Sequence, residues 1–94
     1  MKSEEARAEI ITNGLVQGIG YRYFVIKNAN MLGLNGYTKN LYTGEVLTVV
    51  EGDKPLIEEL FKKLRIGPMR ADVRNSNIKW SKPKYEFNTF EIRF

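Results

Sequence analysis

The chain has 94 residues, of which 43% are hydrophobic and 12% aromatic, and a net charge of +4, which fits one folded domain spanning residues 1–94. It contains no cysteine and no histidine, which excludes a disulfide framework, most zinc, haem and iron–sulfur sites, and Cys–His or Ser–His nucleophile pairs. No apolar run is long enough to span a membrane and the first residues are polar, without a signal-peptide pattern, so we expect a cytoplasmic protein.

The first predicted element is a strand over residues 6–13, in which Ala8, Ile10 and Thr12 alternate with polar side chains. It leads into the stretch from Gly14 to Arg22, which holds three of the eight glycines. A glycine-rich turn between a strand and a helix directs backbone N–H groups toward one point, and the helix N-terminus adds a partial positive charge. The stretch therefore predicts a binding site for a phosphate-sized anion, with a simple tight turn as the alternative.

Two further observations bear on this loop. It is neither a Walker loop, since no Gly-Lys-Ser/Thr follows, nor a dinucleotide fingerprint, since the glycine spacing differs. From Ile10 through Gly44 there is no Asp or Glu, and the only charged residues are Arg22, Lys27 and Lys39. A site for a dianion is expected to exclude carboxylates, because like charges repel the ligand.

A helix is predicted next, over Tyr23 to Leu32, with Gly33 at its C-terminal end. Two β-branched and aromatic runs follow, from Gly36 to Leu41 and from Val46 to Val50. The short segment Tyr42-Thr43-Gly44 between them is typical of a turn, so these two strands are expected to form a hairpin.

The second half of the chain continues with a helix that begins after Asp53 and ends at Gly67-Pro68. A fourth strand is predicted over residues 71–80, where a slip in the alternation indicates a β-bulge near Arg74-Asn75. Residues 87–94 alternate again and predict a terminal strand at a sheet edge.

This order predicts an α+β fold, the ferredoxin-like β-α-β-β-α-β sandwich, with two helices on one face of an antiparallel sheet and an additional C-terminal strand. In that topology the first and second strands run the same way, so the loop after the first meets the end of the second. Arg22 and Asn40 are therefore expected to lie together.

The residues around these positions resemble two motifs of the acylphosphatase family. The first is Gly-x-Val-Gln-Gly-Val-x-Phe-Arg, matched by Gly14 to Arg22. The second is matched by Gly36 to Asn40, then Gly44-Glu45-Val46 and Gly52. The likeness spans nearly the whole chain, and two motifs at the right separation are more specific than either alone.

The departures from the family pattern are small. Ile19 stands where Val is usual and Tyr21 where Phe is usual, which adds a hydroxyl beside the loop. Thr12 replaces a larger aliphatic residue, and Thr38 a small apolar one.

The resemblance implies hydrolysis of a carboxyl–phosphate anhydride, with a small-molecule acyl phosphate as substrate and inorganic phosphate or a similar anion as ligand. The phosphoryl oxygens would be held by the Arg22 guanidinium and by the backbone of the loop. The loop residues are Gln17, Gly18, Ile19, Gly20, Tyr21 and Arg22. Asn40 would hydrogen-bond the attacking water and place it in line. No metal and no cofactor are expected, nor any membrane partner, and the protein is expected to be a monomer.

Several roles follow from residue chemistry. No carboxylate lies in the acid-free segment, so a phosphate oxygen of the substrate is expected to accept the proton from water. Gln17 is expected to shape the loop rather than to react, and strand alternation places Lys39 at the surface, away from Asn40.

The rival interpretation is a non-catalytic module of the same fold that binds an anion or nucleic acid. RNA-recognition domains of this topology carry aromatic residues on the strand corresponding to Val46–Val50, which has none. The basic stretch 62–84 lacks interleaved aromatics, so a solvated surface is expected there and nucleic acid is not an expected partner. A degenerate domain that handles carbamoyl phosphate or serves as an interaction platform, as inside a larger hydrogenase-maturation protein, is a further alternative; the chain length favours the free-standing enzyme.

Overall fold

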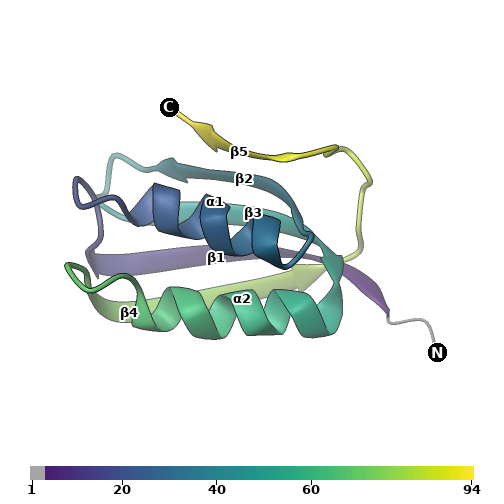
Figure 1. Ribbon diagram of the computed structural model, residues 1–94, viewed down its shortest axis with the longest axis horizontal. Coiled ribbons are helices and arrows are strands. Elements are labelled where there is room, and N and C mark those ends of the chain that lie inside the picture. Colours follow the sequence, from purple (N-terminus) through teal and green to yellow (C-terminus); the bar gives the residue numbers. More distant parts are fainter. Residues whose placement is uncertain (1–3) are drawn as a thin grey trace.

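The computed structural model describes residues 4–94 and contains the predicted elements in the predicted order (Figure 1). The elements are β1 (Glu5–Leu15), α1 (Tyr21–Met31), β2 (Asn35–Asn40), β3 (Val46–Asp53), α2 (Lys54–Ile66), β4 (Asp72–Ser81) and β5 (Phe90–Arg93). No helix between residues 4 and 94 has the length and apolar character needed to cross a membrane.

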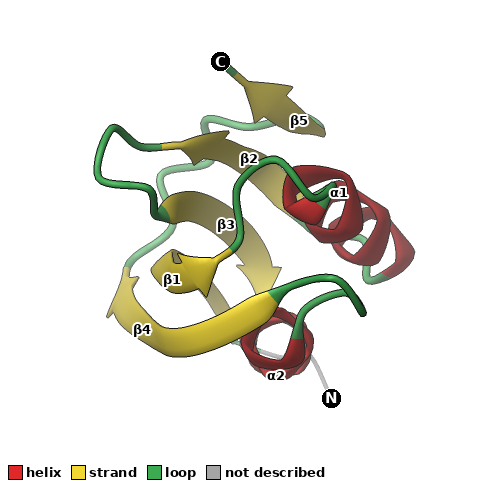
Figure 2. Cartoon of the chain, turned by 90° about the vertical axis from the view of Figure 1, so that its left-hand side faces the viewer, coloured by secondary structure: helices red, strands yellow, loops and turns green. Residues whose placement is uncertain are grey.

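The five strands form one sheet in the order β4-β1-β3-β2-β5, and both helices cover the same face of it (Figure 2). The pairs β1–β3, β1–β4 and β2–β3 are antiparallel, as predicted for a ferredoxin-like sandwich. The terminal strand β5 lies at the edge, as predicted, but it runs parallel to β2. The sheet is therefore mixed rather than wholly antiparallel, because residues 82–89 carry the chain across the end of the sheet where β2 begins (Figure 1).

The helix boundaries follow from local backbone geometry. Helix α1 begins at Tyr21, two residues before the predicted start, because Gly20 at φ 80° ends the loop and its carbonyl accepts the N–H of Phe24 at 3.1 Å. Gly33, at φ 69°, follows the C-cap of α1 as predicted. Asp53 occupies the N-cap position of α2, but its side chain makes no capping hydrogen bond.

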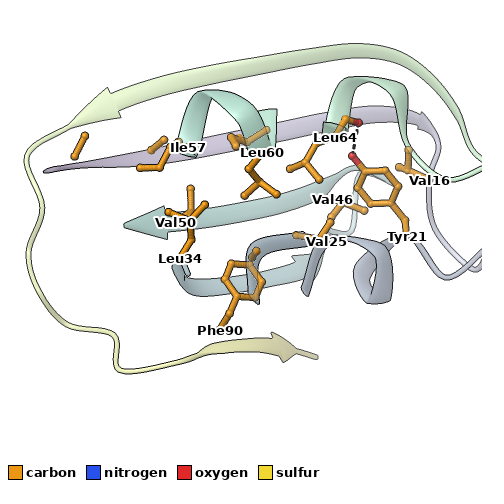
Figure 3. Packing of buried hydrophobic residues seen from close by; sticks show 14 residues of the cluster. Val16, Tyr21, Val25, Leu34, Val46, Val50, Ile57, Leu60, Leu64 and Phe90 are labelled. Atoms are coloured by element: carbon orange, nitrogen blue, oxygen red, sulfur yellow. Dashed lines mark hydrogen bonds between the residues drawn. The ribbon is translucent and has the colours of Figure 1, made fainter. Parts of the chain in front are cut away.

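The core lies between the helices and the covered face of the sheet (Figure 3). In β1 the predicted alternation is present: Ala8, Ile10 and Thr12 are completely buried. The other fully or nearly fully buried apolar side chains come from every layer of the sandwich. They include Val16, Tyr21, Val25, Leu34, Val46, Val50, Ile57, Leu60 and Leu64.

The predicted bulge is present in β4. Asn13 pairs with Asn75 and Gly14 with Val73, so Arg74 is the extra residue. The shift returns Ser76 and Ile78 to the covered face, as the slip in the sequence pattern indicated.

The strand directions bring several loops to one end of the sheet. Strands β1 and β2 both end there, β3 and β4 both begin there, and α1 starts there (Figure 1). We call this the loop end; it comprises residues 16–20, 41–45 and 67–71.

Candidate active site

The loop between β1 and α1 presents unpaired backbone donors at the loop end. Gly18 and Gly20 adopt φ values of 75° and 80°, a region that favours glycine. Among the described residues, no N–H of positions 17–22 donates to a protein acceptor. The first turn of α1 contributes some of these groups together with the positive end of its dipole. We call these backbone donors of residues 17–22 the cradle; their arrangement suits an oxyanion.

Gln17 fastens this loop to the hairpin between β2 and β3. Its side-chain amide donates to the carbonyl of Leu41 and to the carbonyl of Glu45, both at 2.9 Å. Leu41 directly follows Asn40, so the amide links the cradle to the strand end that carries Asn40. The side chain therefore links the loop to the hairpin.

Arg22 lies in the first turn of α1 and is partly exposed. One of its guanidinium nitrogens donates to the carbonyl of Arg93 at 3.3 Å, and the guanidinium carbon lies 4.9 Å from the centre of the Phe94 ring. No carboxylate in residues 4–94 forms an ion pair with it. No described carboxylate therefore compensates its charge, and the hydrogen-bond donors of the guanidinium other than that one nitrogen have no acceptor within residues 4–94.

Asn40 is the last residue of β2 and shares the covered face with the fully buried Thr38. Its side-chain oxygen Oδ1 is buried and has no hydrogen-bond partner within the described part of the chain. A buried acceptor without a partner is costly unless a water or ligand donates to it. Arg93 on β5 pairs with Lys39 on β2, the residue before Asn40. The Arg93 carbonyl, which accepts the hydrogen bond from Arg22, therefore lies one position from Asn40 in the strand register. Arg22 thus contacts the strand β5 at the residue that pairs next to Asn40.

A pocket of about 350 Å³ adjoins Asn40 on the side of the sheet edge. Its walls are Lys39, Leu41, Tyr42 and Phe94, and the last two are fully exposed. Lys39 is partly exposed and lies on the opposite strand face from Asn40, as predicted.

Tyr21 corrects one sequence expectation. Its hydroxyl does not lie beside the loop but is buried beneath α2, where it donates to the carbonyl of Leu64 at 2.7 Å (Figure 3). The hydroxyl also lies 3.3 Å from Thr12 Oγ1. Burial raises the pKa of Tyr21 to about 12, opposed by the hydrogen bond with Thr12. Tyr21 contributes to the cradle only its backbone N–H, which has no acceptor within the described residues.

The other departures from the family pattern also have buried partners. Thr38 donates to the carbonyl of Leu47 and lies 3.0 Å from the Thr48 hydroxyl. The hydroxyl of Thr12 forms a hydrogen bond with the hydroxyl of Tyr21. These threonines are therefore satisfied within the core rather than exposed to the site.

Sequence reasoning missed the part of β5 that reaches the site. The carbonyl of Arg93 and the ring of Phe94 contact Arg22. The alternation of residues 87–94 indicated an edge strand, but its neighbour and direction depend on the path of residues 82–89, for which the sequence carries no signal.

The arrangement can hold a tetrahedral anion and orient a water molecule beside it. The carboxylate of Glu45, the first acid after the acid-free segment, accepts a hydrogen bond from the Thr43 hydroxyl at 2.8 Å. Within residues 4–94, no three potential His, Cys, Asp or Glu ligands converge on a common point.

Comparison with known proteins identifies the family of the chain. The acylphosphatase family model matches residues 8–92. An acylphosphatase of Moorella thermoacetica is 41% identical over 87 residues, which cover 93% of this chain and 92% of that protein. The crystal structure of acylphosphatase from Bacillus subtilis has a TM-score of 0.91 at 28% identity, with 95% of this chain and 99% of that chain covered.

A second solved structure is comparably similar. An acylphosphatase from Coxiella burnetii has a TM-score of 0.86 at 34% identity, with 95% of this chain and 93% of that chain covered. The agreement of sequence and fold over nearly the full length of both partners disfavours the non-catalytic alternative. The chain therefore belongs to the acylphosphatase family and is an enzyme that hydrolyses acyl phosphates.

Proposed function

We propose that the loop 17–22 and the Arg22 guanidinium bind the phosphoryl group of an acyl phosphate, and that Asn40 positions the water that attacks it. The observation that carries this proposal is the set of unsatisfied groups at the loop end. Three kinds of group occur there: the cradle N–H groups have no protein acceptor, the Arg22 guanidinium has no carboxylate partner, and the buried Oδ1 of Asn40 has no donor within the described residues. An anion with a bound water satisfies all three.

The reaction needs little covalent help from the protein. The water oxygen attacks phosphorus, the bond from phosphorus to the carboxyl oxygen breaks, and the carboxylate leaves with the electron pair. A non-bridging phosphate oxygen accepts the proton. The cradle and Arg22 stabilise charge on the phosphoryl oxygens, while Oδ1 of Asn40 accepts a hydrogen bond from the water and fixes its direction.

The test is hydrolysis of benzoyl phosphate in the presence of a chelator. We expect the wild type to remain active and Arg22→Gln to lower kcat/KM by about a thousandfold, because charge stabilisation at the phosphoryl group is lost. Asn40→Ala is expected to lower kcat by about a hundredfold, since the water loses its orientation, while the Kd for inorganic phosphate changes by less than about threefold.

Two variants on the exposed face of α1 serve as matched controls. Lys27→Gln removes a positive charge from the same helix as Arg22, and Asn30→Ala truncates an exposed asparagine. Both should retain wild-type kinetics. Folded Arg22→Gln protein with unchanged kcat/KM would refute the role of Arg22, and Asn40→Ala protein that loses phosphate binding along with turnover would refute a role confined to the water.

The finer assignments belong to the same proposal. The core is complete within one chain, which supports a monomer; analytical ultracentrifugation tests it. A cytoplasmic location is part of the proposal, and cell fractionation tests it.

A further inference from the structure

Helix α2 ends with a carbonyl that its own helix cannot satisfy. The carbonyl of Leu64 would normally accept the N–H of the residue four positions later, but that residue is Pro68, which has none. The hydroxyl of Tyr21 supplies the missing donor at 2.7 Å (Figure 3). The C-terminal turn of α2 is thus capped by the first residue of α1.

The second contact of this hydroxyl has a defined direction. A phenol has one proton, and a carbonyl can only accept, so Tyr21 donates to Leu64. In the 3.3 Å contact between the two hydroxyls the donor is therefore Thr12. The phenolic oxygen joins β1, α1 and α2 at one buried point, and Tyr21 is only 1% exposed.

We propose that Tyr21 is a positioning residue for the reaction, whose buried hydroxyl fixes the N-terminal turn of α1 and with it the cradle and Arg22. This inference rests on the proposed function of that cradle. No side-chain hydrogen bond caps the N-terminus of α1, so this turn is held by the buried bond from Tyr21 to Leu64 and by the longer, exposed bond from Arg22 to Arg93. The high pKa of the phenol keeps it protonated, and therefore a donor, throughout the physiological range.

The anchor acts on groups that bind the phosphoryl oxygens in the ground state and in the transition state alike. Displacing the turn should weaken both interactions equally, which raises KM and leaves kcat nearly unchanged. A purely structural hydroxyl would instead lower the unfolding midpoint without changing either constant at temperatures where the protein stays folded.

The experiment compares four proteins in benzoyl phosphate hydrolysis and inorganic phosphate binding. For Tyr21→Phe we expect KM and the phosphate Kd each to rise about fivefold, with kcat within about twofold of wild type. Thr12→Val alone should leave KM unchanged, because the bond from Tyr21 to Leu64 remains. The double variant should regain part of the lost unfolding midpoint, since no threonine hydroxyl is left unpaired, but should keep the raised KM.

Ile57→Val is the control for lost stability. Ile57 is fully buried near the opposite end of α2, so this variant should lower the unfolding midpoint with unchanged KM. The proposal is overturned if folded Tyr21→Phe has the wild-type KM, or if adding Thr12→Val restores KM together with stability.

Hydrogen exchange separates this proposal from the proposed function. The N–H of Phe24 closes the first turn of α1 on the carbonyl of Gly20. Tyr21→Phe should accelerate exchange at Phe24 relative to the Leu60 amide in the middle of α2. If the wild type neither hydrolyses acyl phosphate nor binds phosphate, the proposed function fails, and selective exchange at Phe24 still supports the anchor. Unchanged exchange at Phe24 refutes the anchor whatever the activity.

Discussion

At the scale of single residues, Gln17 shows how one side chain holds the cradle without touching a ligand. Both hydrogens of its amide are used, one on the carbonyl of Leu41 and one on that of Glu45. Each carbonyl also accepts a backbone donor, from Gly44 and Leu41 respectively. Removal of the amide therefore leaves no carbonyl wholly unpaired.

Gln17→Met keeps the length of the side chain but removes both donors. We expect it to lower the free energy of unfolding by about 1 kcal/mol, at the small end of the range for lost hydrogen bonds, because the carbonyls keep their backbone partners. Gln17→Glu should cost more, since a carboxylate would face two carbonyl oxygens. Urea unfolding measures the free energy of unfolding of both variants. Gln17→Glu protein that is as stable as Gln17→Met protein would contradict these contacts.

At the scale of elements, the bulge in β4 and the end of β1 depend on each other. Gly14 has φ 127°, and a Cβ there would lie 2.1 Å from the carbonyl oxygen of Asp72. This close approach lies at the bulge, where Arg74 is the extra residue of β4. The glycine that begins the loop motif is therefore required by strand pairing as well as by the turn.

Gly14→Ala should lower the free energy of unfolding by more than about 3 kcal/mol, because it combines an unfavourable φ with a backbone collision. Gly44→Ala is the matched comparison. Gly44 has φ 94° with open space around the added carbon, so only the conformational cost of about 1–2 kcal/mol applies. Denaturant unfolding measures the loss of unfolding free energy in both variants. Equal losses would show that the close approach at Gly14 is absent.

The elements also show which features a sequence can predict. Alternation in β1 and the slip around Arg74 predicted two strands, their inward faces and the bulge, because side-chain direction in a strand is a local property. The predicted start of α1 at Tyr23 was wrong by two residues, since the observed start at Tyr21 depends on the φ of Gly20. The parallel pairing of β5 and the buried partners of Tyr21 depend on distant parts of the chain, so local patterns carry no signal for them.

At the scale of the whole molecule, an ion cluster at the end opposite the cradle holds the crossover to β5. Glu51 on β3 is buried and accepts hydrogen bonds from Arg7 at 3.0 Å and from the backbone of Lys84 and Tyr85 at 2.6 and 3.1 Å. Arg7 also pairs with Glu86 at 2.7 Å. Residues 82–89 lead from β4 to β5, so this cluster fixes where β5 begins and, through β5, the carbonyl beside Arg22.

The protonation of Glu51 should therefore control the stability of the whole sandwich. Burial acts to raise the pKa of Glu51, but the hydrogen bonds from Lys84, Arg7 and Tyr85 outweigh it and leave the pKa below its ordinary value of 4.5. A lowered folded-state pKa stabilises the protein above pH 4.5, and this contribution disappears as the pH falls through the folded-state value.

Glu51→Gln removes the charge and is expected to cost about 2 kcal/mol at pH 7, because Arg7 loses its buried partner but keeps its ion pair with Glu86. The difference in unfolding free energy between wild type and variant should shrink steadily as the pH falls below 4.5, since protonated Glu51 resembles the amide. Glu58→Gln is the control, because Glu58 is exposed on α2; its unfolding free energy at pH 7 should stay within about 0.5 kcal/mol of wild type. A difference for Glu51→Gln that stays constant from pH 7 to pH 3 would mean that the charge of Glu51 does not hold the crossover in place.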